Sequence, residues 1–132
     1  MKQLLLILIL LSLPLPSLAG DFQKGLTAYE AGDYATALQE WTPLAEQGDT
    51  AAQFYLGFMH RNGEGVPQNY KTAVKWYTLA AEQGDAAAQF NLALMHKNGE
   101  GIPQDYSAAM KWYTLAAEQG HAGAQLNLAL MY

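Results

Sequence analysis

Cysteine is absent from the 132 residues of the chain. Its absence excludes a disulfide framework, a catalytic thiolate and a metal site built on cysteine. Basic residues are also few, with 7 lysines and arginines against 12 aspartates and glutamates, so the formal net charge is −5. A chain without a basic stripe has no means of following a phosphate backbone, and we therefore expect no nucleic-acid partner.

Serine is scarce, and Ser107 is the single serine beyond the N-terminal segment. No histidine and aspartate stand at a motif spacing from it, and the chain lacks the Ser-x-x-Lys box that serine β-lactamases use. The carboxylates recur as evenly spaced ladders, and nothing in the sequence gives two of them the different environments that acid–base catalysis needs. We therefore expect a non-enzymatic protein without a cofactor.

No apolar run is long enough to cross a membrane. Residues 4–13 are interrupted by one serine, whereas a hydrocarbon core of about 30 Å needs roughly 20 apolar residues. Lys2 precedes this run, two prolines follow it, and Ser17-Leu18-Ala19 has small residues at the positions that a signal peptidase recognises. The pattern predicts a secretory signal peptide over residues 1–19, cleaved after Ala19, rather than a membrane anchor. The mature chain is then expected to be periplasmic or secreted, without a membrane span.

What the sequence does contain is an internal repeat. The stretch from Gly48 to Gly84 recurs 36 residues later, from Gly84 to Gly120, with most positions unchanged. A fixed period of this size is typical of a solenoid, in which each unit buries its apolar face against its neighbours. The sequence therefore predicts an all-α solenoid of stacked helix pairs.

Each repeat is expected to contain two helices. Apolar residues at helical spacing predict a first helix, called helix A, over residues 51–61 and 87–97, and a second, called helix B, over residues 70–83 and 106–119. A glycine after each helix B predicts a left-handed C-terminal turn, and the aspartate that follows predicts a cap for the next helix A. His121 replaces this aspartate before the last helix, where we expect a weaker cap.

The repeats divide the chain into units with atypical ends. Two full repeats cover residues 50–85 and 86–121, and residues 122–132 form helix A of a partial repeat. Residues 20–49 form a degenerate helix pair, because their second helix is predicted to be one residue shorter than its counterparts. Terminal repeats are expected to be atypical, since only one of their sides meets a neighbour.

The partial repeat lacks a helix B to cover Leu126, Leu130 and Met131. Two interpretations fit this apolar surface. The sequence is either part of a longer repeat protein, or the apolar end docks onto another chain, in a homodimer or in a complex with an envelope enzyme that the chain would regulate or support structurally.

Apolar residues cover a wide arc of helix A, so this helix is expected to lie between its own helix B and a neighbouring repeat. The repeated core is predicted at Leu56, Trp76, Leu92 and Trp112. Because helix B is predicted to bury Trp76, its replacement by alanine is expected to cost roughly 3–5 kcal/mol. The arc that remains on helix A is narrow, and the small Gly57 near its centre predicts a shallow furrow there.

Three motifs recur at constant spacing in the repeats. They read A-Q-F-N-L-A-L-M from Ala88, N-G-E-G-I-P-Q-D-Y from Asn98, and A-x-x-W-Y followed by A-A-E-Q-G between Ala109 and Gly120. Together they resemble the Sel-one-like repeat (SLR) family, a branch of the tetratricopeptide-like helical repeats, over residues 50–132 and more weakly before. The resemblance implies a right-handed superhelix of antiparallel helix pairs with helix A on the concave face. It also implies a protein–protein adaptor, a role often found in secreted or periplasmic bacterial proteins.

A protein or peptide partner is therefore expected along the stacked helix A faces, with Tyr55 as an anchor. The predicted contacts are Gln53, Tyr55, His60, Gln89, His96 and Gln125. Two features depart from the family pattern. His60 and His96 stand where the family usually has tyrosine, which Tyr132 keeps, and Tyr55 stands where Asn91 and Asn127 keep the family asparagine.

We interpret His60 and His96 as partly exposed substitutes for tyrosine. A pH-sensitive contact and a shared metal ion are the alternatives, although packed helices lie about 8–10 Å apart, which is long for one ion. A hydrolase is a further alternative, because some secreted cysteine-rich proteins with such repeats have been linked to β-lactam hydrolysis. Their repeats carry paired cysteines, which this chain lacks.

Overall fold

The computed structural model describes residues 20–132, so the predicted signal peptide over residues 1–19 lies outside the described part of the chain. Residues 20–132 form seven α-helices and no strand. The helices are α2 (Phe22–Glu30), α3 (Tyr34–Glu46), α4 (Thr50–Asn62), α5 (Tyr70–Glu82), α6 (Ala86–Asn98), α7 (Tyr106–Glu118) and α8 (Ala122–Met131). None of these helices combines the length and the apolar character that a membrane span requires.

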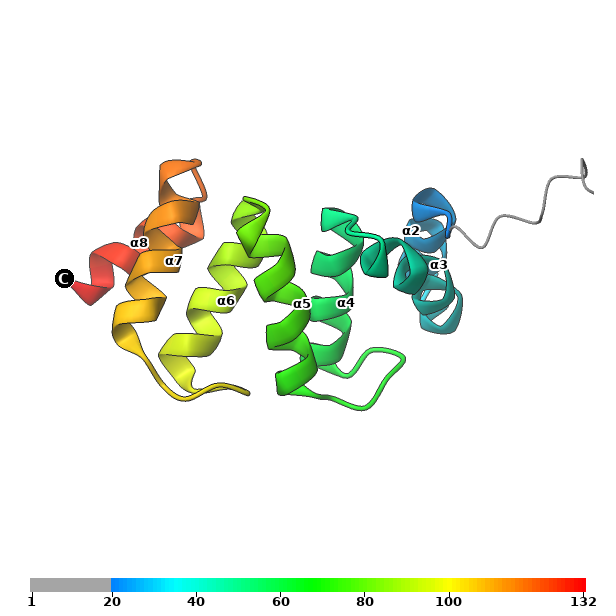
Figure 1. The fold of residues 1–132 in the computed structure, drawn as a ribbon, viewed down its shortest axis with the longest axis horizontal. Coiled ribbons are helices and arrows are strands. Elements are labelled where there is room, and N and C mark those ends of the chain that lie inside the picture. Colours follow the sequence, from blue (N-terminus) through cyan, green and yellow to red (C-terminus); the bar gives the residue numbers. More distant parts are fainter. Residues whose placement is uncertain (1–19) are drawn as a thin grey trace, which may run out of the picture.

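The helices form one row in chain order, as Figure 1 shows. Each helix packs mainly against the helix before it and the helix after it. Helices α4, α6 and α8 are the expected A helices, and α3, α5 and α7 are the B helices. This arrangement confirms the predicted all-α repeat solenoid, in which contacts are made between neighbouring units.

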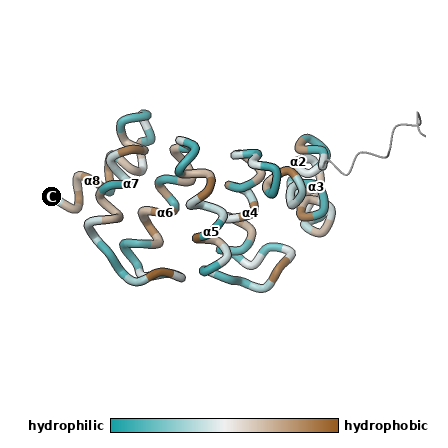
Figure 2. The backbone as a smooth tube through the Cα atoms, viewed as in Figure 1, coloured by the Kyte–Doolittle hydropathy of each residue, from teal (hydrophilic) through white to brown (hydrophobic). Residues whose placement is uncertain are grey.

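Hydrophobic and hydrophilic residues alternate along α4 to α7, and neither kind fills a whole helix (Figure 2). Such mixing is typical of helices with one buried and one exposed face. The core accordingly forms a series of small clusters between neighbouring helices, each built largely from alanine with a few large side chains.

The helix starts are capped as the sequence predicts. The backbone N–H of Ala52 donates to Asp49 and that of Ala88 donates to Asp85, both at 2.8 Å. Before α8, the Nδ1 atom of His121 accepts from the N–H of Ala124 at 3.1 Å. Histidine thus makes the same capping bond as the aspartates, at a slightly longer distance.

The second glycine of each N-G-E-G loop lies at a junction between units. Gly65 and Gly101 have φ angles of 72° and 71°, in the left-handed region. A Cβ atom on Gly101 would lie 2.5 Å from the carbonyl carbon of Tyr70, at the start of the preceding helix B, and one on Gly65 would lie 2.6 Å from the Cβ of Tyr34. Glycine is needed here both for the backbone conformation and for the close approach of the loop.

The glutamate of the same loop connects to helix A of the preceding unit. Glu64 accepts a hydrogen bond from the hydroxyl of Tyr29 at 2.7 Å. Glu100 lies 3.5 Å from the guanidinium of Arg61. Tyr29 and Arg61 occupy corresponding places near the ends of α2 and α4, so these side chains link successive units in the same way.

The most buried side chains of helix B are tyrosines, which the sequence analysis did not identify. Tyr77 and Tyr113 are 0 % exposed, whereas Trp76 and Trp112 are only half-buried. Successive helical residues point about 100° apart, so Tyr77 faces the core of its own unit. Trp76 packs instead against the core cluster of the preceding pair. The cost predicted for Trp76→Ala, which assumed full burial, is therefore too large. Leu56 and Leu92 are each 1 % exposed.

The furrow predicted at Gly57 does not exist, because this glycine is buried. A Cβ atom there would lie 2.7 Å from the ring of Tyr77. Gly25 of α2 has the same relation to the ring of Trp41. The small residues allow helix A to approach an aromatic ring of helix B, so they serve packing.

The N-terminal pair is more regular than predicted. Helices α3 and α5 both have 13 residues and both begin with tyrosine, so α3 lacks no residue. In this register Trp41 takes the place of Tyr77, and its indole N–H donates to the carbonyl oxygen of Phe22 at 3.1 Å.

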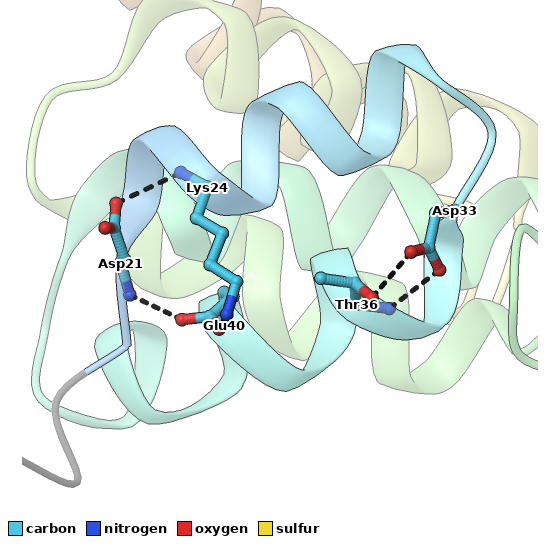
Figure 3. A network of polar contacts seen from close by, with 5 residues as sticks. All are labelled: Asp21, Lys24, Asp33, Thr36 and Glu40. Carbon is cyan, nitrogen blue, oxygen red and sulfur yellow. Dashed lines mark hydrogen bonds and ion pairs between the residues drawn. The ribbon is translucent and has the colours of Figure 1, made fainter. Parts of the chain in front are cut away.

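Polar contacts near the chain start hold α2 against α3 (Figure 3). The backbone N–H of Asp21 donates to Glu40 at 2.8 Å. The other carboxylate oxygen of Glu40 lies 3.0 Å from the ammonium of Lys24. At the other end of the pair, Asp33 caps α3 through the N–H and the hydroxyl of Thr36.

Candidate partner-binding site

Two of the six predicted contact residues are unavailable to a partner. Gln53 and Gln89 are 3 % and 4 % exposed. The amide of Gln53 donates to the carbonyl oxygen of Ala45 at 3.1 Å, and that of Gln89 donates to Ala81 at 3.2 Å. The prediction placed both glutamines on the polar arc of helix A, but the end of the preceding helix B covers them. They connect units and do not face a partner.

Each of these glutamines accepts a second hydrogen bond from the end of the following helix B. Gln83 donates to the Oε1 atom of Gln53 at 2.7 Å, and Gln119 donates to the Oε1 atom of Gln89 at 2.9 Å. The amide of Gln83 also donates to the carbonyl oxygen of Gly48 at 3.1 Å. This role was not predicted from the sequence, although the E-Q-G motif that ends each helix B contains the donor glutamine.

Replacing Gln89 with leucine is expected to destabilise the fold by about 1–3 kcal/mol, because the change removes the two hydrogen bonds that the buried Gln89 makes with Ala81 and Gln119. Gln125→Leu is the matched control: Gln125 makes the same bond to Ala117 but is exposed, so water replaces the lost partner. Urea unfolding followed by circular dichroism measures both changes. Equal losses in the two variants would contradict the role of burial.

Tyr55 belongs to an aromatic cluster at the junction of the first two units. Its ring stacks on that of Trp41, with centroids 4.5 Å apart. The rings of Phe22, Tyr29 and Phe54 lie 6.0, 5.8 and 5.5 Å from it. In α6 the corresponding Asn91 bonds only to its own helix. Tyr55 is half-buried, so one part of the ring is fixed by packing while the rest remains accessible.

His60 and His96 lie at corresponding positions in the last turns of α4 and α6. Both are half-buried, and the Nδ1 atom of each is buried without a hydrogen-bond partner. Their backbone carbonyl oxygens accept from the N–H groups of Asn69 and Asp105. Burial lowers the pKa of both imidazoles, and at His96 the nearby carboxylate of Asp105 opposes part of this effect. Both side chains are therefore favoured in the neutral form.

The lowered pKa values predict that stability falls as the pH is lowered from about 6.5, where free histidine titrates, toward the folded pKa. In this window the unfolded chain binds more protons than the folded chain, which favours unfolding. The variant with His60→Tyr and His96→Tyr is expected to lose less stability between pH 7.5 and 5.5. Melting temperatures across this range test the prediction, and identical profiles for both proteins would contradict it.

The described residues contain no group of three or more histidines, aspartates or glutamates that is placed to hold a metal ion. Gln125 is exposed on α8, next to Leu126 and Leu130, which are 61 % and 73 % exposed. Docking of another chain at this end, by a second copy or by an envelope enzyme, stays a prediction. Tyr55, His60, His96 and Gln125 are thus the predicted contacts that a partner can reach.

Comparison with known proteins matches this architecture. The family described as Sel1 repeat matches residues 50–85 and 86–121. A crystal structure of a Sel1 repeat protein from Oxalobacter formigenes is 39% identical, with a TM-score of 0.81, over 84% of this chain and 46% of that one. A protective antigen with an SLR fold, present in uropathogenic Escherichia coli strains, is 39% identical with a TM-score of 0.73, over 80% of this chain and 24% of that one. This chain therefore spans less than half the length of either structure. No curated protein matches it.

Proposed function

The chain belongs to the Sel1 repeat family, and from this premise we propose that it is a non-catalytic scaffold that binds a protein partner along its A helices. Sel1 repeats typically serve in protein–protein interaction, and the fold is generally a non-catalytic scaffold.

One observation carries the proposal. The last turns of α4 and α6 present the same half-buried side chain, His60 and His96, while Gln53 and Gln89 of the same arc are buried. Tyr55 lies on the same helix as His60, and its ring is held by the stacked indole of Trp41. A rigid aromatic side chain loses little conformational entropy on binding, which favours such residues as anchors.

We define the helix A surface as Tyr55, His60, His96 and Gln125. This set retains the predicted contacts that are accessible and omits Gln53 and Gln89. A partner segment that follows α4 and α6 contacts a histidine in the last turn of each helix. The partner's identity is not implied by these residues.

The test compares captured proteins rather than a single affinity. The variant with His60→Ala and His96→Ala is expected to lose partners that the unchanged protein captures from an extract of the producing cells by cross-linking. The control variant, Lys71→Ala and Ser107→Ala, changes two exposed residues at the starts of the B helices. Retention of the same proteins by the histidine variant would refute the helix A surface as the binding site.

We further propose that the scaffold acts outside the cytoplasm, as a periplasmic or secreted protein. The support is the charged start, the apolar run and the small residues of segment 1–19. Mass spectrometry of the mature protein tests the proposal, and Gly20 is the expected first residue. A chain that retains residues 1–19 in the cell extract would contradict it.

A further inference from the structure

A second surface lies on the helix B side, between the end of α3 and the middle of α5. It contains a hollow of about 600 Å³. Trp76, which is half-buried, and Leu79, which is 38 % exposed, give it an apolar lining. Glu46 and Glu82 lie at its edges, and the ammonium of Lys75 is 5.2 Å from the centroid of the Trp76 ring.

Every residue that lines this hollow has an identical counterpart 36 residues later. The contact between lysine and tryptophan recurs as well, with Lys111 6.0 Å from the Trp112 ring, and Leu115 is 37 % exposed like Leu79. We call the two surfaces the helix B grooves: the first lies around Trp76 and the second around Trp112. The exposed lysine, leucine and glutamate side chains are therefore the same in both helix B grooves.

The carboxylates along the helix B grooves differ from the others in the described part of the chain. All five aspartates of residues 20–132 cap helices. Three glutamates elsewhere bond to other side chains or to the backbone: Glu40, Glu64 and Glu100. In residues 20–132, the glutamates of the grooves, Glu46, Glu82 and Glu118, have neither a hydrogen bond nor an ion pair through their side chains, and Glu30 on α2 is the one other such case.

We propose that the helix B grooves bind an extended segment of a protein partner whose apolar side chains are flanked by lysine or arginine. An apolar side chain fits against Trp76 and Leu79, where it removes exposed apolar area from water. Basic side chains face the unpaired carboxylates of Glu46 and Glu82, which supplies charge complementarity.

The groove already accommodates a cation of the kind proposed. The ammonium of Lys75 lies over the face of Trp76, and a tryptophan ring attracts cations at this distance. The apolar side chain of the partner would compete with Lys75 for the face of Trp76, and the ammonium of Lys75 would repel the basic side chains beside it. The helix B grooves share no residue with the helix A surface, so the test of one site does not depend on the outcome of the other.

The test uses the purified protein and a synthetic probe, acetyl-Arg-Leu-Ala-Arg-Leu-Ala-Lys-amide, in isothermal titration at low and at physiological salt. The matched peptide with serine in place of both leucines keeps the charge and removes the apolar side chains. We expect the leucine peptide to bind at two equivalent sites and at least about tenfold more tightly than the serine peptide. Equal affinities, or no binding of the leucine peptide, would overturn the proposal.

Two charge reversals locate the site on the protein. Glu82→Lys is expected to weaken the leucine peptide by at least about tenfold, because Glu82 borders both grooves. Glu30→Lys is the control, since it changes the net charge equally but lies on α2, away from the grooves. Glu82 is in the last turn of α5, where lysine is favourable for the helix dipole, so this variant is expected to remain folded. Equal weakening by both changes would show attraction to net charge alone and refute the site.

Competition by Lys75 supplies an independent measurement. Lys75→Met keeps the aliphatic stem and removes the ammonium, so the leucine peptide is expected to bind several-fold more tightly. A loss of affinity in this variant would contradict the proposed contact of the partner with Trp76. Sedimentation identifies the competing occupant: self-association that Glu82→Lys abolishes, without any peptide binding, would assign the grooves to a second copy and overturn the proposal.

Discussion

Trp41→Ala is expected to lower the free energy of unfolding by about 3–5 kcal/mol, the range for removing a fully buried tryptophan. Trp41 is 0 % exposed. Its indole N–H bonds to the carbonyl of Phe22, and its ring stacks against that of Tyr55. The change therefore leaves a cavity and removes a buried hydrogen bond at the junction of the first two units.

Trp76→Ala is the matched control, because it removes the same side chain from a half-buried site. Its expected cost is smaller, since water already reaches part of the ring and less apolar area is lost. Guanidinium unfolding monitored by circular dichroism measures both variants. A cost for Trp76→Ala equal to that for Trp41→Ala would contradict the difference in burial.

Gly101→Ala is expected to destabilise the protein by about 2–4 kcal/mol, the sum of a left-handed backbone penalty and a steric conflict. The φ angle of Gly101 is 71°, and the added Cβ would lie 2.5 and 2.6 Å from the carbonyl carbon and oxygen of Tyr70. The conflict is relieved only if the loop of the second repeat moves away from α5, because the contacted atoms belong to the backbone and not to a flexible side chain.

Gly120→Ala isolates the backbone contribution. Its φ angle is 88°, and a Cβ atom there would have no neighbour within 4 Å. The expected cost is about 1–2 kcal/mol, from the left-handed conformation alone. Thermal unfolding of the two variants side by side measures the difference. If Gly120→Ala is as costly as Gly101→Ala, the contact with Tyr70 contributes nothing.

Most of the fold could be predicted from the repeat in the sequence. A period of 36 residues, with glycine and an N-terminal cap at fixed places, predicts the helices to within one or two residues of their ends. A turn glycine and a helix cap act on neighbouring residues of the chain, so their effects can be predicted from one sequence. The tyrosines at 77 and 113 were not identified because two large aromatic residues are adjacent in each helix B. Which of them faces the core depends on how the helix is rotated against its neighbours.

The candidate site was less predictable, and the glutamines show why. The helical arc places Gln53 beside His60, but its burial depends on Ala45 before it and Gln83 after it. Both partners belong to other helices, and their positions follow from stacking rather than from local spacing. The histidines lie beyond these contacts, toward the ends of the A helices, and stay half-exposed.

The glutamine bonds also bear on how the chain folds as it is synthesised. Gln53 and Gln83 are 30 residues apart, Tyr29 and Glu64 are 35 apart, and Arg61 and Glu100 are 39 apart. These separations do not grow with the number of units, so added copies lengthen the protein without raising the entropy cost of closing any one contact. Each unit is expected to dock as soon as the next helix B has emerged, which gives vectorial folding from the N-terminus and a folding rate nearly independent of length.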